Sequence, residues 1–167
     1  MVRWLDLKSE PNSRAGLFLI DMKDTNYPFF DGNLRGHLKL ISVDIDSNDP
    51  TLAKSVFELT CDKSLCNATG NLHGGAVALA FDMCTSVTVA PVAKDDFWDT
   101  GHVSRTLNCT YIRPAPEGTV LLVESDIVHL GKSMGMIRGV MRRKDNGLVC
   151  YTCEHGKARV IRPKPSL

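Results

Sequence analysis

The chain has 167 residues, of which 43% are hydrophobic and 23% are charged, and its formal net charge is +1. This length and composition suit one globular domain with a single core, and they argue against a disordered chain. A net charge so close to zero gives no general attraction to nucleic acid or to an acidic membrane surface, so we expect neither as a partner.

The first part of the chain shows no clear periodicity. We expect residues 1–36 to form an N-terminal extension packed on or beside the main domain, which we place at 37–162, and residues 163–167 to form a C-terminal tail. Within the extension, the apolar run 17–20 predicts a short packed segment, and the turn-forming residues of 27–36 predict a loop.

Regular structure begins with two strands. Alternating hydrophobic and polar residues predict strands over 41–45 and 56–61. The residues of 46–50 favour a turn, so we expect the two strands to form a hairpin.

The longest apolar stretch runs from the Gly74-Gly75 pair to Pro91 and contains one formal charge, Asp82. It predicts a helix that is buried on every side and ends near the proline. A membrane span is disfavoured, because a carboxylate in mid-helix costs about 2.5–3.5 kcal/mol. Three interpretations stay open: a core helix whose carboxylate bonds a neighbour, a glycine pair that only permits tight packing, or a site that binds an oxyanion at the helix start and uses the carboxylate further in.

Four more strands are predicted after the helix, over 103–112, 120–129, 134–142 and 148–161. The polar segment before them contains Phe97 and Trp98, which either line a substrate mouth or pack within a surface loop. A helix buried on every side beside an antiparallel sheet requires the sheet to curl around it. We therefore expect an α+β fold.

The chain contains six cysteines, and its N-terminus lacks the uninterrupted apolar run of a secretory leader. We expect reduced thiols in a cytoplasmic or mitochondrial protein that is not secreted. The spacing Cys150-x-x-Cys153 has no second pair to complete a zinc site, so we expect no metal.

One motif resembles a known family. The run Asn67-Ala68-Thr69-Gly70-Asn71-Leu72-His73-Gly74-Gly75, followed by Asp82, resembles the hot-dog-fold acyl-CoA thioesterases, in particular the phenylacetate-pathway type and its eukaryotic relatives. Residues that also resemble this family lie at Val103-Ser104, 111–115 and Gly131-Lys132. The resemblance covers about 38–160. It implies a hot-dog fold, in which a curved antiparallel sheet wraps one long buried helix. It also implies a double hot-dog dimer, often paired into a tetramer, and no cofactor apart from the coenzyme A of the substrate.

The resemblance also implies roles at the reacting bond. The Gly74 N–H, at the positive end of the helix, and the Asn67 side-chain amide would polarise the thioester carbonyl. Asp82 would act as general base for the attacking water, or less readily as a nucleophile. Ser104 would position that water, although a hydroxyl on a strand often bonds only its neighbours.

Further residues are expected to bind the substrate. His73 and Gly75 flank the helix mouth, where His73 is expected to pack or cap the helix. Basic residues near the strand ends would meet the coenzyme A phosphates, although each is also a common type of solvated strand residue: Arg113, Lys132, Arg138, Arg142 and Lys157.

The spacing of Gly74 and Asp82 adds a geometric constraint. Eight residues along one helix separate them by about 12 Å, so one carbonyl and its attacking water cannot touch both. We therefore expect an active site shared between two subunits of a homodimer or homotetramer.

Two other functions are considered. A non-catalytic acyl-CoA sensor would lack the carboxylate at position 82 and carry a DNA-binding segment. A hot-dog dehydratase or hydratase would use a catalytic histidine, and His73 lies before the glycines rather than in the expected site.

Overall fold

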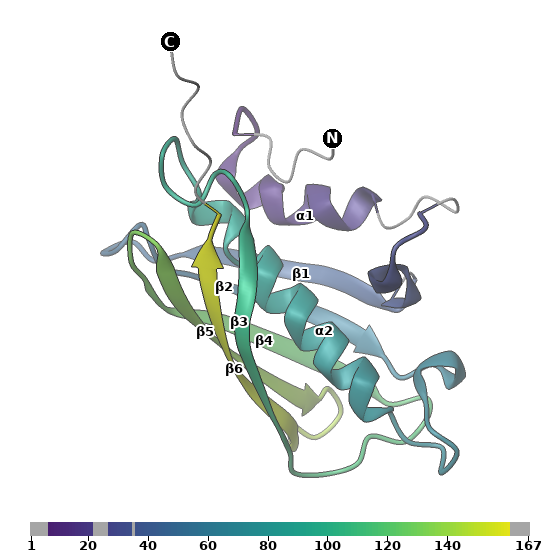
Figure 1. The fold of residues 1–167 in the computed structure, drawn as a ribbon. Helices are drawn as coiled ribbons and strands as arrows, with labels where there is room; N and C mark the ends of the chain where they lie inside the picture. The colour runs from purple at the N-terminus through teal and green to yellow at the C-terminus, as the bar shows by residue number, and fades with distance from the viewer. Residues whose placement is uncertain (1–6, 22–26, 35, 161–167) are drawn as a thin grey trace.

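The computed structural model describes residues 7–21, 27–34 and 36–160. A six-stranded antiparallel sheet curls around one long helix, α2 (Figure 1). The strands are β1 (Leu38–Ile45), β2 (Ala53–Thr60), β3 (His102–Tyr111), β4 (Val120–Leu130), β5 (Met134–Arg143) and β6 (Val149–Arg159). This arrangement confirms the predicted α+β hot-dog architecture.

The order of the strands across the sheet is β1-β2-β4-β5-β6-β3. The predicted hairpin between β1 and β2 is confirmed. Asn146 and Gly147 form the turn between β5 and β6, where Gly147 has a φ of 72° that favours glycine. β3 pairs with β6 alone and forms one edge of the sheet. The long-range pairing of β3 with β6 places residues of these two strands side by side, which decides the composition of the site.

Helix α2 (Gly74–Val87) is capped by His73 and ends a few residues before the predicted stop at Pro91. Pro91 lies in a separate 3-10 turn, η3 (Ala90–Val92). One face of α2 packs into the sheet through side chains that include Val77, Phe81 and Cys84. The stretch Gly74–Val92 is long and apolar enough to cross a membrane by length and composition, yet 67% of that window is buried inside the protein. A core helix accounts for this pattern.

The opposite face of α2 remains partly open in the single chain. Gly75 is exposed, and Leu79, Asp82 and Ser86, which recur at helical spacing, are only half-buried. The expectation of burial on every side is therefore wrong for one chain. The six strands cover only one side of the helix, and the second side has no covering element along this stripe within the described residues.

The N-terminal residues add helices beside the sheet. Helix α1 (Pro11–Asp21) packs against β1 and η3, where Arg14 Nη1 donates to the Ala93 carbonyl at 2.6 Å. The predicted packed segment 17–20 falls within α1, although its side chains lie outside the description. The predicted loop contains a short 3-10 helix, η1 (Phe30–Leu34), that lies near α2. The predicted tail, 163–167, lies outside the described residues, and the proposed domain boundaries stay predictions.

Trp98 occupies the centre of a second core cluster, together with Val89, Leu130 and Ile137. It is 0% exposed, and its Nε1 donates to the Gly131 carbonyl at 2.9 Å. Trp98 therefore neither lines a substrate mouth nor packs within a surface loop, and both expectations are wrong for this residue. Its acidic neighbours in the sequence suggested exposure, but the indole fills the space between η3 and the β4–β5 turn.

Candidate active site

Asp82 and Ser104 form a hydrogen bond between the helix and the edge strand. Asp82 lies on the open face of α2, and Ser104 lies near the start of β3. The Ser104 hydroxyl donates to Asp82 Oδ1 at 2.8 Å. The two residues that the sequence assigned to water activation are therefore brought together within one chain.

Two residues of β6 complete this group. Ser104 pairs with Lys157 in the β3–β6 register, and His155 lies two positions earlier on the same face of β6. His155 Nε2 lies 2.9 Å from Ser104 Oγ and 3.4 Å from Asp82 Oδ1. Lys157 Nζ lies 3.3 Å from Ser104 Oγ and 3.8 Å from Asp82 Oδ1. The contacts that Asp82 makes with Ser104, His155 and Lys157 are all to Oδ1, and Asp82 Oδ2 has no partner among the described residues.

The Ser104 hydroxyl lies within hydrogen-bonding distance of two acceptors, Asp82 Oδ1 and His155 Nε2. Burial, reinforced by the Lys157 charge and partly offset by Asp82, lowers the pKa of His155 to about 4, so its imidazole is neutral at pH 7. The Thr85 hydroxyl donates to the Phe81 carbonyl at 2.6 Å, so it accepts from His155 Nδ1 at 2.6 Å. His155 Nε2 is then an acceptor, and it competes with Asp82 Oδ1 for the single proton of Ser104.

Lys157 is enclosed in the protein. Its side chain is 2% exposed, because β6 directs it inward beneath Ser104. Burial lowers the pKa of Lys157 to about 8, and the neighbouring Asp82 carboxylate limits that decrease. The expectation that Lys157 lies at the surface and meets a phosphate is therefore wrong in this structure, since its ammonium is directed to the carboxylate.

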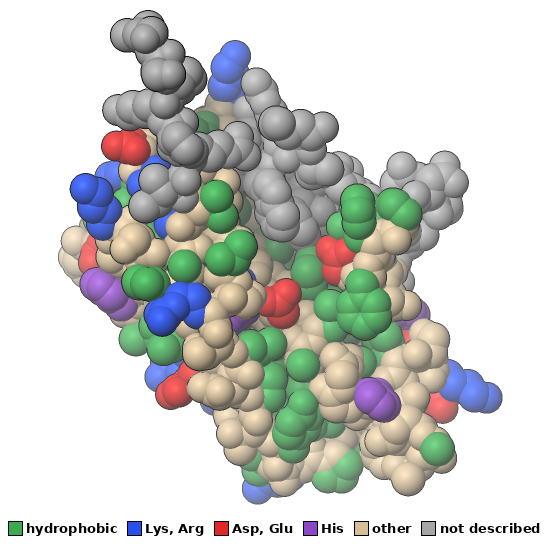
Figure 2. All heavy atoms as spheres, viewed as in Figure 1, with side chains coloured by type: hydrophobic (Ala, Val, Ile, Leu, Met, Phe, Trp, Pro, Cys, Tyr) green, Lys and Arg blue, Asp and Glu red, His purple; other side chains and the backbone are tan. Residues whose placement is uncertain are grey.

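A cavity of about 360 Å³ opens beside Asp82. Figure 2 shows acidic and hydrophobic side chains close together in the middle of this face of the protein. Residues from α2, β3, β6 and η1 line the cavity: Phe30, Asp31, Leu79, Asp82, Met83, Ser86, His102, Val103, Ser104 and Lys157. The Asp82 carboxylate, which is 39% exposed, can therefore meet a ligand that occupies this space.

His102 is an unusual member of the cavity wall. Both of its ring nitrogens are enclosed and have no hydrogen-bond partner in the described part of the chain, and the ring lies 5.8 Å from that of Trp98. Burial, with a smaller contribution from the Lys157 charge, lowers the pKa of His102 to about 3. The ring is therefore neutral at pH 7 and acts as an aromatic wall between the cavity and the second core cluster.

The start of α2 forms a separate group. His73 Nδ1 accepts from the Gly75 N–H at 2.9 Å, which confirms that His73 caps the helix. This bond occupies the Gly75 N–H, whereas the Gly74 N–H has no acceptor within the described residues. Asn67 Oδ1 accepts from Thr69 and Asn71, so its amide NH₂ is the free end of that side chain.

These two groups lie on the same helix but do not meet. Gly74 and Asp82 are both within α2, so their separation is about 12 Å, as the sequence predicts. The edge residue Tyr111 lies over the helix start, where its hydroxyl donates to the Gly74 carbonyl at 2.9 Å. Each chain thus has the residues predicted to polarise the carbonyl and those predicted to activate water at two separate places.

The basic residues expected to bind coenzyme A do not form one patch. Arg138 pairs with Asp126 at 3.2 Å and Arg142 with Glu124 at 3.1 Å. Arg113, just beyond β3, donates to the Val149 carbonyl at 2.8 Å. Lys132 lies in the β4–β5 turn, at the opposite end of the β3–β6 pair, which spans about 30 Å.

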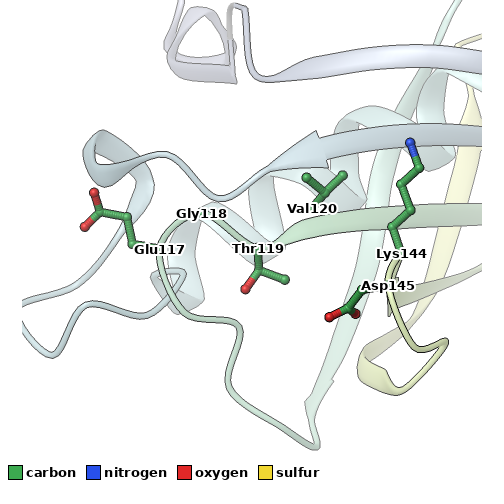
Figure 3. A pocket seen from close by; sticks show the side chains of 6 residues that line it. All are labelled: Glu117, Gly118, Thr119, Val120, Lys144 and Asp145. Carbon is green, nitrogen blue, oxygen red and sulfur yellow. The ribbon is translucent and has the colours of Figure 1, made fainter.

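A larger hollow of about 500 Å³ lies elsewhere, between the β3–β4 loop and the β5–β6 turn (Figure 3). Its wall is formed by Glu117, Gly118, Thr119, Val120, Lys144 and Asp145. The Lys144 ammonium is held by Glu58 at 2.6 Å. This hollow is at the far end of the β5–β6 hairpin from Lys157, and none of the predicted site residues lines it.

Comparison with known proteins gives a family match over the middle of the chain. Residues 69–150, which include both Asp82 and Ser104, match the family model described as Thioesterase superfamily. Over these residues the chain is similar to the thioesterase superfamily. A curated Caenorhabditis elegans protein named as an esterase is 28% identical to this chain over 115 residues, and the match spans 69% of this chain and 66% of the relative.

Solved structures show the same fold. Zebrafish thioesterase superfamily member 2 has a TM-score of 0.73 and 23% identity, and the match covers 86% of this chain and 94% of that protein. A Streptococcus pneumoniae thioesterase protein solved with coenzyme A has a TM-score of 0.59 and 15% identity, and the match covers 74% of this chain and 89% of that protein. The solved structures confirm the predicted hot-dog fold, and the family match and the esterase relative agree with the predicted family and with its enzyme class, the thioester hydrolases.

Three residues of this group were not predicted from the sequence in these positions. His155 was not considered, Lys157 was placed at the surface, and Thr85 was not singled out. The alternation of β6 contained a signal, because His155 and Lys157 occupy two successive inward positions of the strand. A titratable side chain directed into a core is expected to have a specific partner, and here the partner is Ser104 with Asp82.

Proposed function

We propose that this protein is a thioesterase that hydrolyses acyl-CoA to a free acid and coenzyme A, with Asp82 as general base. The observation that supports it best is the Ser104–Asp82 hydrogen bond at the edge of the 360 Å³ cavity. Ser104 and the residues of β6 hold Oδ1, which leaves Oδ2 free to accept a proton from water. A positioned general base is typically worth about 10²–10⁴ in rate.

The proposed reaction proceeds in two steps. Asp82 takes a proton from water as the oxygen attacks the thioester carbonyl carbon, and the negative charge develops on the carbonyl oxygen. The carbonyl then re-forms, the C–S bond breaks, and the coenzyme A sulfur takes the proton back from Asp82. The Gly74 N–H and the Asn67 amide are the proposed donors to the oxyanion, and one such donor is typically worth about 10²–10³ in rate.

The hydrogen-bonding group suits the proposed proton transfer. In the resting state, Asp82 Oδ1 and His155 Nε2 lie 2.8 and 2.9 Å from one Ser104 hydroxyl and share its single proton. The proton that Asp82 takes from water goes to Oδ2, which none of these partners contacts, so Oδ1 keeps its hydrogen bond to Ser104. We infer that the group holds the orientation of the carboxylate while the water is deprotonated.

The site is proposed to form between two subunits. Asp82 and Gly74 are about 12 Å apart in one chain, so the carbonyl donors next to Asp82 must come from Asn67 and Gly74 of the partner subunit. The open stripe of α2 and the edge strand β3 are the surfaces on which such a partner would pack. Val103 and Tyr111 of β3, both exposed in the single chain, support this arrangement.

Coenzyme A is the proposed carrier of the acyl group. The Streptococcus pneumoniae structure with coenzyme A supports this choice for a protein of the same fold. Lys132 is the best remaining candidate for a phosphate contact, because it is exposed and forms no ion pair among the described residues. Arg113 is the candidate for a phosphate contact at the opposite end of β3. All six cysteines are free thiols, which fits the proposed cytoplasmic or mitochondrial location.

The position of His155 argues against a dehydratase. A histidine does lie in the site, contrary to the expectation from the sequence, but it is 0% exposed and both ring nitrogens are hydrogen-bonded to Thr85 and Ser104. It cannot reach a substrate proton without leaving these partners. Asp82, at the cavity, is the accessible base.

The proposed function is tested with a panel of acyl-CoA substrates, from acetyl to palmitoyl and including aryl-acetyl forms, with release of free thiol as the readout. We expect hydrolysis by the natural protein and a decrease in kcat of about 10²–10⁴ for Asp82→Asn. The control is Asp44→Asn, an exposed carboxylate of β1. No hydrolysis of any panel member, or a kcat of Asp82→Asn equal to that of the control, would contradict the proposal.

A further inference from the structure

The cavity beside Asp82 has a wall that the strands and α2 do not supply. Leu79 and Met83 of α2 form one side, and Val103 of β3 forms another. The remaining side is formed by Phe30 and Asp31 of η1, which precedes the first strand of the hot-dog sheet. An N-terminal element thus contributes two side chains of very different chemistry to the proposed substrate site.

Phe30 is an apolar side chain at the rim of the cavity. It is 77% exposed, and covering its phenyl ring with a ligand would remove apolar surface from water. Phe30, Leu79, Met83 and Val103 are the four apolar side chains among the ten lining residues. An acyl chain that crosses from Asp82 towards η1 would bury this ring.

Asp31 places a second carboxylate at the same cavity. The Tyr27 hydroxyl donates to Asp31 Oδ2 at 2.8 Å, which fixes the orientation of the side chain. Asp82 already contributes one negative charge to the lining, and Lys157, the only lysine or arginine among the lining residues, is directed to Asp82. A ligand that brings a further carboxylate close to Asp31 therefore meets repulsion without a free cation to offset it.

We infer that η1 selects the acyl group: Phe30 covers an apolar chain, and Asp31 rejects chains that end in a carboxylate. The preferred substrates are then neutral alkyl or aryl acyl-CoAs, and dicarboxylic acyl-CoAs are excluded. This inference rests on the proposed function, since it assigns the 360 Å³ cavity to the acyl group.

The test of Asp31 compares two substrates of equal carbon number, octanoyl-CoA and suberyl-CoA. The natural protein should prefer octanoyl-CoA in kcat/KM by tenfold or more, on the order expected for like charges in a partly desolvated site. Asp31→Asn removes the charge but keeps an oxygen that can accept from Tyr27, and it should narrow this preference by about threefold to tenfold. Asp44→Asn, the control, should retain the natural preference.

The test of Phe30 uses its neighbour as a control. Phe29 is also exposed, at 57%, but it packs edge-on against Tyr27 at 5.1 Å and does not line the cavity. Phe30→Ala should raise KM for octanoyl-CoA by about threefold to tenfold, the range of a lost apolar contact. The increase should be smaller for acetyl-CoA, and Phe29→Ala should behave as the natural protein.

The outcomes separate this inference from the function on which it rests. If the natural protein hydrolyses no acyl-CoA, the proposed function fails, and the inference fails with it. If hydrolysis depends on Asp82 but Asp31→Asn and Phe30→Ala match their controls in substrate preference and KM, the inference alone is overturned. Circular dichroism of each variant establishes that it has the fold of the natural protein.

Discussion

Lys157 Nζ lies 3.8 Å from Asp82 Oδ1, and the pair joins an enclosed ammonium to a half-exposed carboxylate. The two charges reach this distance because β6 directs Lys157 inward next to Ser104, opposite the open face of α2. One oxygen of the carboxylate is thus held by the protein, and the other faces the cavity. This asymmetry is what a general base needs, since the fixed oxygen orients the reactive one.

The first prediction concerns the charge of Lys157. Its pKa is lowered to about 8, so the ammonium loses its proton as the pH rises through that value, and the positive charge next to Asp82 and Ser104 is lost. We expect kcat/KM to fall above pH 8 in the natural protein. Lys157→Met should be less active at pH 7 and should lack this alkaline decrease. Lys39→Met, a change of an exposed lysine of β1, serves as the control, and an unchanged alkaline decrease in Lys157→Met would contradict the assignment.

The second prediction concerns His102 and stability in acid. Its pKa is about 3 in the native protein and about 6.5 when unfolded, so between these values the unfolded chain binds a proton that the native protein does not. Stability is therefore lost as the pH falls below 6.5. His102→Phe removes this proton binding and the two unpaired nitrogens. The free energy of unfolding of the natural protein should decrease by about 2–3 kcal/mol more than that of the variant between pH 6.5 and 4.5.

Urea unfolding at the two pH values measures this difference. His129→Phe, a change of an exposed histidine of β4, should lose as much stability in acid as the natural protein. Equal losses in His102→Phe and in the natural protein would show that His102 is protonated in the native state.

The third prediction concerns Ser104. Ser104→Ala removes the donor to Asp82 Oδ1 and leaves His155 Nε2 and Lys157 without that partner. Because the hydroxyl acts on the base and not on the bound substrate, kcat should fall by about tenfold to a hundredfold with little change in KM. Steady-state kinetics of Ser104→Ala and of Ser133→Ala, a control in the β4–β5 turn, check this. A rise in KM at constant kcat would instead assign Ser104 to substrate binding.

Local patterns in the sequence predicted the elements well, because each depends on neighbouring residues. The glycine pair, the apolar run to Pro91 and the Asn146-Gly147 turn all correspond to elements of the fold. The pairing of β3 with β6 connects residues about fifty positions apart, and no local pattern specifies it. Ser104 was assigned by family resemblance, whereas its contacts with His155 and Lys157 depend on that pairing.

The errors have related causes. Lys157 was expected at the surface because lysine is rarely buried, and the structure encloses it only because Asp82 lies opposite. Trp98 was judged from its acidic neighbours in the sequence, although a large indole contributes more by filling a core. The expectation that α2 is buried on every side failed for a similar reason, because composition alone cannot show whether a helix is covered by its own chain or by another.

We propose that each active site combines Asp82 of one chain with Asn67 of another, and complementation between two inactive variants tests this arrangement. Asp82→Ala and Asn67→Ala chains are unfolded, mixed in equal amounts and refolded together, with each variant and the natural protein refolded alone as controls. Random pairing makes about half of the dimers mixed, and one of the two sites in each mixed dimer has both residues intact. Acyl-CoA hydrolysis should then recover to about a quarter of the natural activity, whereas a mixture no more active than its two parents would show that one chain supplies the whole site.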